Sequence, residues 1–197
     1  GLGGNIVHDE IGPSTTTNFA VDVSYTIHFE NESRLAFGIK AGGQLLNIDY
    51  TKLNHYNPSD VSFRNNINSQ FSPNIGAGLF YYNENSYLGL SVPMLLQTKM
   101  YDEFAYSDVN RRQHFYLTGG RVFDVTDNIK FKPAFIAKMV AGAPLQVDLT
   151  GNFLINEKFT VGVAYRWSAA LSALVGFKVN DRVSIGYGYD RETTRLA

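Results

Sequence analysis

An alternation with a period of two runs without a break through residues 159–168. The odd positions are apolar and the even positions are small or polar: Phe159, Val161, Val163, Tyr165 and Trp167 against Thr160, Gly162, Ala164, Arg166 and Ser168. Because successive side chains of a strand point to opposite faces, the pattern predicts a strand with one apolar and one polar face. Residues 145–150 alternate in the same way, and the turn residues 156–158 lie between the two segments. Together they predict an antiparallel hairpin with a tight turn.

The same period of two recurs along most of the chain. About ten strands are predicted, most of them roughly 9–12 residues long, as a tilted transmembrane strand requires, whereas strands of soluble proteins average about 5–6 residues. Residues 11–16 predict a loop, and residues 50–70 and 98–112 predict two long polar loops. In chain order, the other predicted strands cover residues 1–10, 19–29, 34–49, 71–82, 87–97, 114–125, 129–141, 171–179 and 183–190.

The connections between the predicted strands alternate in length. Short turns centred near residues 31, 84, 127, 157 and 181 fall at one end of the strands, and the long loops fall at the other end. One rim of tight turns and one rim of longer loops is typical of an outer-membrane barrel. We therefore predict an all-β fold, an antiparallel transmembrane β-barrel, as a single domain over residues 1–197. A soluble β-sandwich or a lipocalin-like barrel is the alternative.

Composition agrees with a membrane barrel and excludes several classes of function. Aromatic residues make up 14% of the chain, yet mean hydropathy is only −0.15, as expected when half of each strand faces water. No apolar run approaches the roughly 20 residues of a spanning helix. The net charge of −1 lacks the basic footprint of a nucleic-acid-binding protein, so we expect no nucleic-acid partner. The absence of cysteine excludes disulfides and thiolate metal sites.

The polar positions of the predicted strands provide candidate lumen-facing residues. Asp148 and Arg166 lie on partner strands of one hairpin, so we expect them to face the same lumen as a charge pair rather than as catalytic groups. The histidines show no spacing that suggests a metal site, and no Ser/His or Asp/His constellation suggests an enzyme, so we expect no cofactor. The candidate lumen-facing residues are Asp22, Lys130, Lys132, Asp148 and Arg166, and the candidate surface-loop contacts are Tyr101, Tyr106, Arg111 and Arg112.

Several stretches in this order and spacing resemble the PorP/SprF family, outer-membrane proteins of the Bacteroidetes type IX secretion system. The resemblance covers essentially the whole chain, and the ordered set is more specific than any one motif. The stretches are GLGGNIVHDEIG at 1–12, SRLAFG at 33–38, PNIGAGLFYY at 73–82, YLGLSVP at 87–93, Phe131-Lys132-Pro133 with Lys138, and GYGYD at 186–190.

The resemblance implies a non-enzymatic component of the type IX secretion and gliding machinery in the cell outer membrane. Its implied partners are outer-membrane lipid, a secreted surface adhesin or its C-terminal domain, and periplasmic ring or lipoprotein components of the secretion system. Family members are longer at both ends, so we expect the chain to be part of a larger barrel, incomplete at both ends. The alternative function is a general outer-membrane porin or solute channel, because the predicted lumen carries charges of both signs.

Overall fold

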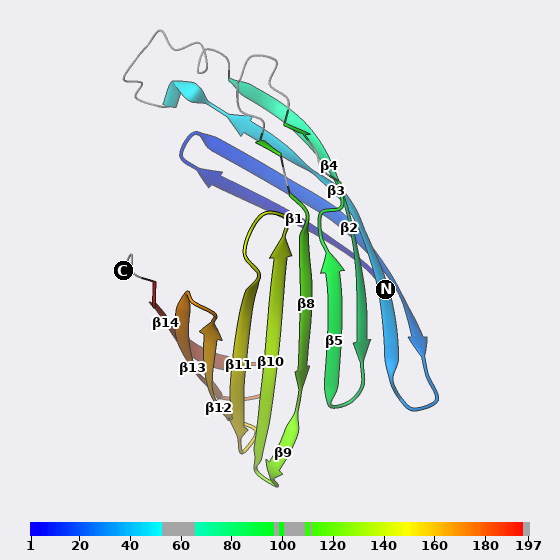
Figure 1. Ribbon diagram of the computed structural model, residues 1–197, viewed down its shortest axis with the longest axis vertical. Coiled ribbons are helices and arrows are strands. Elements are labelled where there is room, and N and C mark those ends of the chain that lie inside the picture. The colour runs from blue at the N-terminus through cyan, green and yellow to red at the C-terminus, as the bar shows by residue number, and fades with distance from the viewer. Residues whose placement is uncertain (53–65, 97–98, 101–108, 111, 195–197) are drawn as a thin grey trace. The chain divides into compact units, whose positions relative to one another are not determined.

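The computed structural model describes residues 1–52, 66–96, 99–100, 109–110, 112–194. These residues form strands and one short 3₁₀ helix, η1 (Tyr50–Lys52), and no described helix is long and apolar enough to cross a membrane. The strands are β1 (Leu2–Ile11), β2 (Ser14–His28), β3 (Arg34–Ile48), β4 (Ile67–Tyr82), β5 (Ser86–Val92), β6 (Lys99–Met100), β7 (Val109–Asn110), β8 (His114–Arg121), β9 (Phe123–Thr126), β10 (Ile129–Val140), β11 (Gln146–Ile155), β12 (Phe159–Arg166), β13 (Ala170–Lys178) and β14 (Ser184–Glu192) (Figure 1).

Twelve of the described strands form one antiparallel sheet, which confirms the all-β prediction and is consistent with a β-barrel. The order is β1-β2-β3-β4-β5-β8-β10-β11-β12-β13-β14, with β9 paired to β10, and it does not return to β1. The sheet has more than the ten or so strands predicted, partly because residues 114–125 divide at Val122 into β8 and β9. β6 and β7 form a separate small ladder inside the segment predicted as the second long loop.

The described chain divides into two compact units. The first comprises Gly1–Tyr25, Phe37–Gly78 and Val92–Gln113, and the second comprises Thr26–Ala36, Leu79–Ser91 and His114–Ala197. The prediction of one domain over residues 1–197 stays a prediction.

In the first unit, β1 and β2 pair from Leu2 opposite Val23 to Ile11 opposite Ser14. The predicted loop 11–16 is therefore wrong in extent, because the chain reverses at Gly12, which has a φ of +59°, and pairing resumes at Ser14. On the apolar side of this unit, the rings of Phe19 and Phe71 stack with their centroids 6.1 Å apart.

In the second unit, the strand register sorts side chains into two faces. Directly opposite residues of an antiparallel pair share a face, so one row across β10 to β14 contains Phe131, Phe153, Val161, Val175 and Tyr187. The neighbouring row, on the other face, contains Lys132, Asn152, Gly162, Leu174 and Gly188. Each strand therefore separates an apolar face from a face of small and polar groups. We call the latter the polar face.

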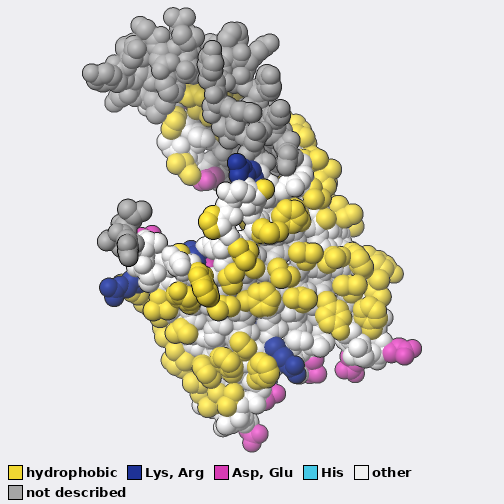
Figure 2. All heavy atoms as spheres, in the orientation of Figure 1, with side chains coloured by type: hydrophobic (Ala, Val, Ile, Leu, Met, Phe, Trp, Pro, Cys, Tyr) yellow, Lys and Arg dark blue, Asp and Glu magenta, His cyan; other side chains and the backbone are white. Residues whose placement is uncertain are grey.

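The apolar face is not covered by a second layer of the described chain. Leu46, at 8% exposure, is the only described large hydrophobic residue classed as buried, whereas Trp167, Tyr187 and Ile185 are each more than 60% exposed. Figure 2 shows hydrophobic side chains over the side of β5, β8 and β10 that faces the viewer, with acidic side chains at the end that carries the short turns. A contiguous apolar surface of this size requires a hydrophobic environment around it.

Asparagine side chains accept backbone hydrogen bonds in three of the short turns of the second unit. Asn83 Oδ1 accepts hydrogen bonds from the backbone N–H of Asn85 at 3.0 Å and of Ser86 at 2.7 Å. Asn31 and Asn180 accept equivalent bonds in the turns between β2 and β3 and between β13 and β14. Since Asn oxygens replace a backbone acceptor in this way, the turns satisfy amides that the strand ladder leaves unpaired.

Aromatic rings on both faces lie over glycines of the neighbouring strand. A Cβ added at Gly120 would lie 2.8 Å from the ring of Tyr87, its register partner on β5, and one added at Gly119 would lie 2.7 Å from the ring of Phe135 on β10. A side chain at either glycine would therefore displace the ring that packs on it.

We expect Gly120→Val to destabilise the protein by about 1–3 kcal/mol, because the new side chain overlaps the ring of Tyr87. Urea unfolding in lipid vesicles, followed by the fluorescence of the single tryptophan Trp167, measures this change. Gly188→Ala is the matched control, since its Cβ meets no atom closer than 3.9 Å. An equal decrease in the free energy of unfolding in both variants would contradict the packing argument.

Candidate functional site

Four of the five candidate lumen residues lie on the polar face of the second unit, in two pairs at different heights along the strands. Lys130 and Lys132 are on β10, and the register places Asp148 of β11 directly opposite Arg166 of β12. Asp22 lies in the first unit, where its carboxylate is 3.5 Å from the Lys40 ammonium. The prediction that these residues face a barrel lumen stays a prediction.

Asp148 is the centre of a cluster of three charged side chains. Arg166 donates from Nε to Oδ1 at 3.0 Å, and Lys138 donates from Nζ to Oδ2 at 3.1 Å. The Asp148 side chain is 13% exposed, so the two cations cover most of the carboxylate. Lys138 is opposite Gln146 and therefore reaches Asp148 diagonally from β10. The carboxylate holds three adjacent strands together and neutralises one of two close cations.

The two candidate lysines at the short-turn end have different partners. Lys130 forms an ion pair with the well-exposed Asp124 at 3.5 Å. The ammonium of Lys132 lies 5.4 Å from the centre of the Tyr87 ring, a favourable cation–π position.

The Lys132 contact continues into an aromatic ladder that sequence reasoning missed. Phe80 stacks on Tyr87 at 5.7 Å and contacts Tyr82 at 5.4 Å, and the Arg34 guanidinium lies 5.9 Å from the Tyr82 ring. Alternation alone gives no signal for this ladder, because its residues come from β3, β4, β5 and β10 and meet only through the order and register of the strands.

The candidate loop contacts are outside most of the described structure. Tyr101, Tyr106 and Arg111 lie outside the described residues. Arg112 is within the described residues. Its side chain is exposed, and it precedes the start of β8 at His114.

The base of the first predicted long loop is closed by hydrogen bonds between its two ends. Asp49 Oδ1 accepts from the Thr51 hydroxyl at 2.6 Å, the Thr51 amide at 3.1 Å and the Asn66 side-chain amide at 3.0 Å. In return, Asn66 Oδ1 accepts from the Tyr50 amide at 2.9 Å. The Thr51 bonds, with help from Asn66 and Lys52, hold the pKa of the Asp49 carboxyl below its ordinary value of 3.8.

Among the described residues, no group of three histidine or carboxylate side chains is placed to hold a metal ion. The arrangement on the polar face is therefore one of ion pairs and aromatic contacts, which can fill, stiffen or line a surface and can bind a partner.

Comparison with known protein families assigns the chain to one family. The family model described as "Type IX secretion system membrane protein PorP/SprF" matches residues 1–197, the full length of the sequence. The chain belongs to the PorP/SprF family. No curated protein matches it significantly. As a PorP/SprF protein it is a membrane component of type IX secretion, which accounts for the long antiparallel strands and for the uncovered apolar face.

We expect Asp148→Ala to destabilise this PorP/SprF protein by about 1–3 kcal/mol, because it leaves the cations of Lys138 and Arg166 close together without their carboxylate. Urea unfolding in vesicles gives the free energy. Asp124→Ala is the matched control, since it breaks an exposed pair on the same face and should cost less than about 1 kcal/mol. Equal losses would show that the Asp148 cluster adds nothing beyond surface pairing.

The Asp49 contacts predict a pH dependence of the loop base. Because the folded pKa is lowered, the stabilisation is complete above the unfolded pKa and is lost as the pH falls through the folded value. A ¹³C NMR titration of the Asp49 carboxyl should give a midpoint below 3.8, and Thr51→Val should move it upward. A midpoint unchanged by Thr51→Val would contradict the role of that hydroxyl.

Proposed function

We propose that the protein is a non-enzymatic outer-membrane component of the type IX secretion machinery that docks or delivers a secreted surface adhesin. The observation that carries this proposal is the family match over residues 1–197. The uncovered apolar face supports insertion in a bilayer, because exposed side chains such as Trp167 and Tyr187 are the kinds that contact lipid and its interface.

The strands carry long loops at one end and short turns at the other, which suggests that different partners bind at the two ends. Long loops of outer-membrane barrels face the cell surface and short turns face the periplasm. The loop residues Tyr101, Tyr106, Arg111 and Arg112 would then contact the adhesin or its C-terminal domain. The asparagine-built turns would contact periplasmic ring or lipoprotein components.

The test is gentle extraction of the tagged, full-length protein from its own outer membrane, followed by mass spectrometry of what remains bound. We expect a large surface adhesin and periplasmic ring components in the same particle. A loop variant carrying Tyr101→Ala, Tyr106→Ala, Arg111→Glu and Arg112→Glu should lose the adhesin and keep the ring components.

The matched control for the loop variant is Glu84→Lys in the β4–β5 turn, which should weaken the ring components instead. A deletion strain should also lose the adhesin from the cell surface. Normal adhesin display in the deletion strain would overturn the proposal.

A general porin is the second candidate, and the mixed charges of the polar face favour it. Asp22 with Lys40, and Asp148 with Lys138 and Arg166, are groups that a water-filled lumen accommodates. Steady conductance of the purified protein in planar bilayers, together with a particle free of secretion proteins, would favour this function. An electrically silent protein would reject it.

A further inference from the structure

Two hollows lie next to each other on the polar face of the second unit. The larger, about 630 Å³, lies at the short-turn end, and the smaller, about 320 Å³, lies farther along β12, β13 and β14. Leu174 lines both, so the two hollows adjoin along the strands, and we call them together the groove. The stretch of β14 that lines it runs from Ser184 to Asp190, about 20 Å at the usual strand rise.

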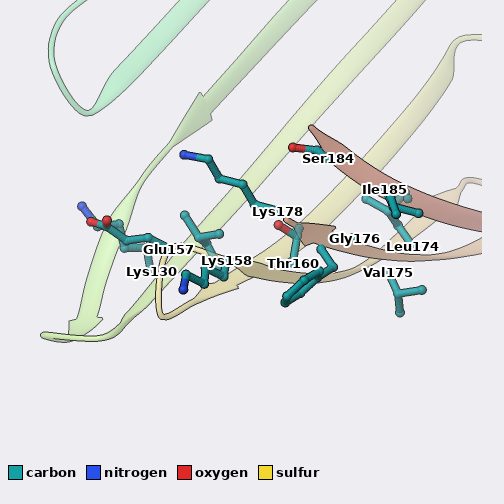
Figure 3. A pocket seen from close by; sticks show the side chains of 13 residues that line it. Lys130, Glu157, Lys158, Thr160, Leu174, Val175, Gly176, Lys178, Ser184 and Ile185 are labelled. Carbon is teal, nitrogen blue, oxygen red and sulfur yellow. The ribbon is translucent and has the colours of Figure 1, made fainter. Parts of the chain in front are cut away.

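The larger hollow combines an apolar lining with amines. Leu154 and Leu174 line it together with Thr160, and the ammonium groups of Lys130, Lys158 and Lys178 stand at one end (Figure 3). Among the described residues, Glu157 is the only acidic group that lines this hollow. The hollow therefore suits an apolar side chain next to carboxylates.

The lysines of the larger hollow can exchange their present partners. Lys178 pairs with Asp181, which is 96% exposed, and Lys130 pairs with Asp124, which is 69% exposed. Exposed ion pairs of this kind contribute little, so a bound carboxylate can replace either partner at small cost. Lys158 takes part in none of the ion pairs formed among the described residues.

The smaller hollow has a different lining. Its floor contains small residues such as Gly162 and Gly188, and its polar groups are Thr150, Asn152 and Ser172, with Asp190 beside them. Hydroxyl and amide groups of this kind can hydrogen-bond the N–H and C=O groups of an extended backbone. The Thr150 hydroxyl already donates to the Ala134 carbonyl at 3.3 Å, but an acyl chain would offer no hydrogen-bond partner to Asn152 or Ser172, so this hollow favours a peptide over a lipid tail.

We propose that this groove binds an extended polypeptide segment of about six residues, with acidic residues at the lysine end and alternating apolar residues beyond them. The segment belongs to a partner protein, and its carboxylates lie against Lys130, Lys158 and Lys178. This inference stands independently of the adhesin role proposed above, since it rests on the lining of the groove.

The test uses the full-length protein in lipid nanodiscs and fluorescence anisotropy. The probe is an eight-residue peptide, labelled at its carboxyl end, with two aspartates followed by alternating leucine and threonine. We expect saturable binding, and binding at least about fivefold weaker for a peptide with lysines in place of the aspartates.

The charge-reversal variant Lys158→Glu with Lys178→Glu should invert that preference and bind the lysine peptide better. Lys52→Glu is the matched control, because it reverses a lysine that also has an ion pair but lies in the first unit. It should bind the acidic peptide as the unchanged protein does. The heat-induced shift on electrophoresis confirms that each variant is folded.

Three results would overturn the proposal. The first is equal binding of the acidic and the lysine peptide. The second is a loss of acidic-peptide binding in Lys52→Glu as large as in the variant with Lys158→Glu and Lys178→Glu. The third is binding of dodecanoate without binding of either peptide, which would make the groove a site for amphiphilic anions. None of these results would alter the co-purification expected for the adhesin role, so the two proposals can fail separately.

Discussion

A single layer of backbone has to separate two environments, and the other features of the described sheet depend on this constraint. The hydrogen-bond ladder lies within the layer and pairs each strand with its neighbours in the described order. The side chains alone then distinguish the faces, because their period is two. This is why Phe131 and Lys132, adjacent in sequence, lie in environments of opposite polarity. A shift of one residue in register would exchange the two faces of a whole strand.

The polar face is filled by interactions that do not require a closed core. Asp148 connects β10, β11 and β12 through ion pairs with Lys138 and Arg166, and the ring of Tyr87 packs against Gly120 of the adjacent strand. Both devices work within one layer, since each partner is a neighbour in the ladder. Small residues such as Gly162 and Gly188 leave the remaining surface hollow, which gives a groove where a protein with two layers would have packed side chains.

The sequence predicted the strands well where one face is apolar and poorly where both faces are polar. Strand β2 begins at Ser14 rather than at residue 19, because Ser14–Asn18 are polar on both faces yet still pair with β1. The predicted strand at 87–97 ends at Val92, since Pro93 has no N–H to donate to a ladder. The pairing of Asp148 with Arg166 follows from hairpin register, but the diagonal contact of Lys138 does not, because it crosses a second strand pair.

The order of the strands also determines how the chain can assemble. Nearly every strand of the sheet pairs with a strand next to it in sequence, so hairpins such as β11–β12 can close over a few residues. The pairing of β5 with β8 instead closes over residues 93–113. Closure entropy costs about 0.6 kcal/mol for each doubling of loop length. Local hairpins should therefore form first in the nascent protein, and the pairing of β5 with β8 should follow and join the two sets of hairpins into one sheet.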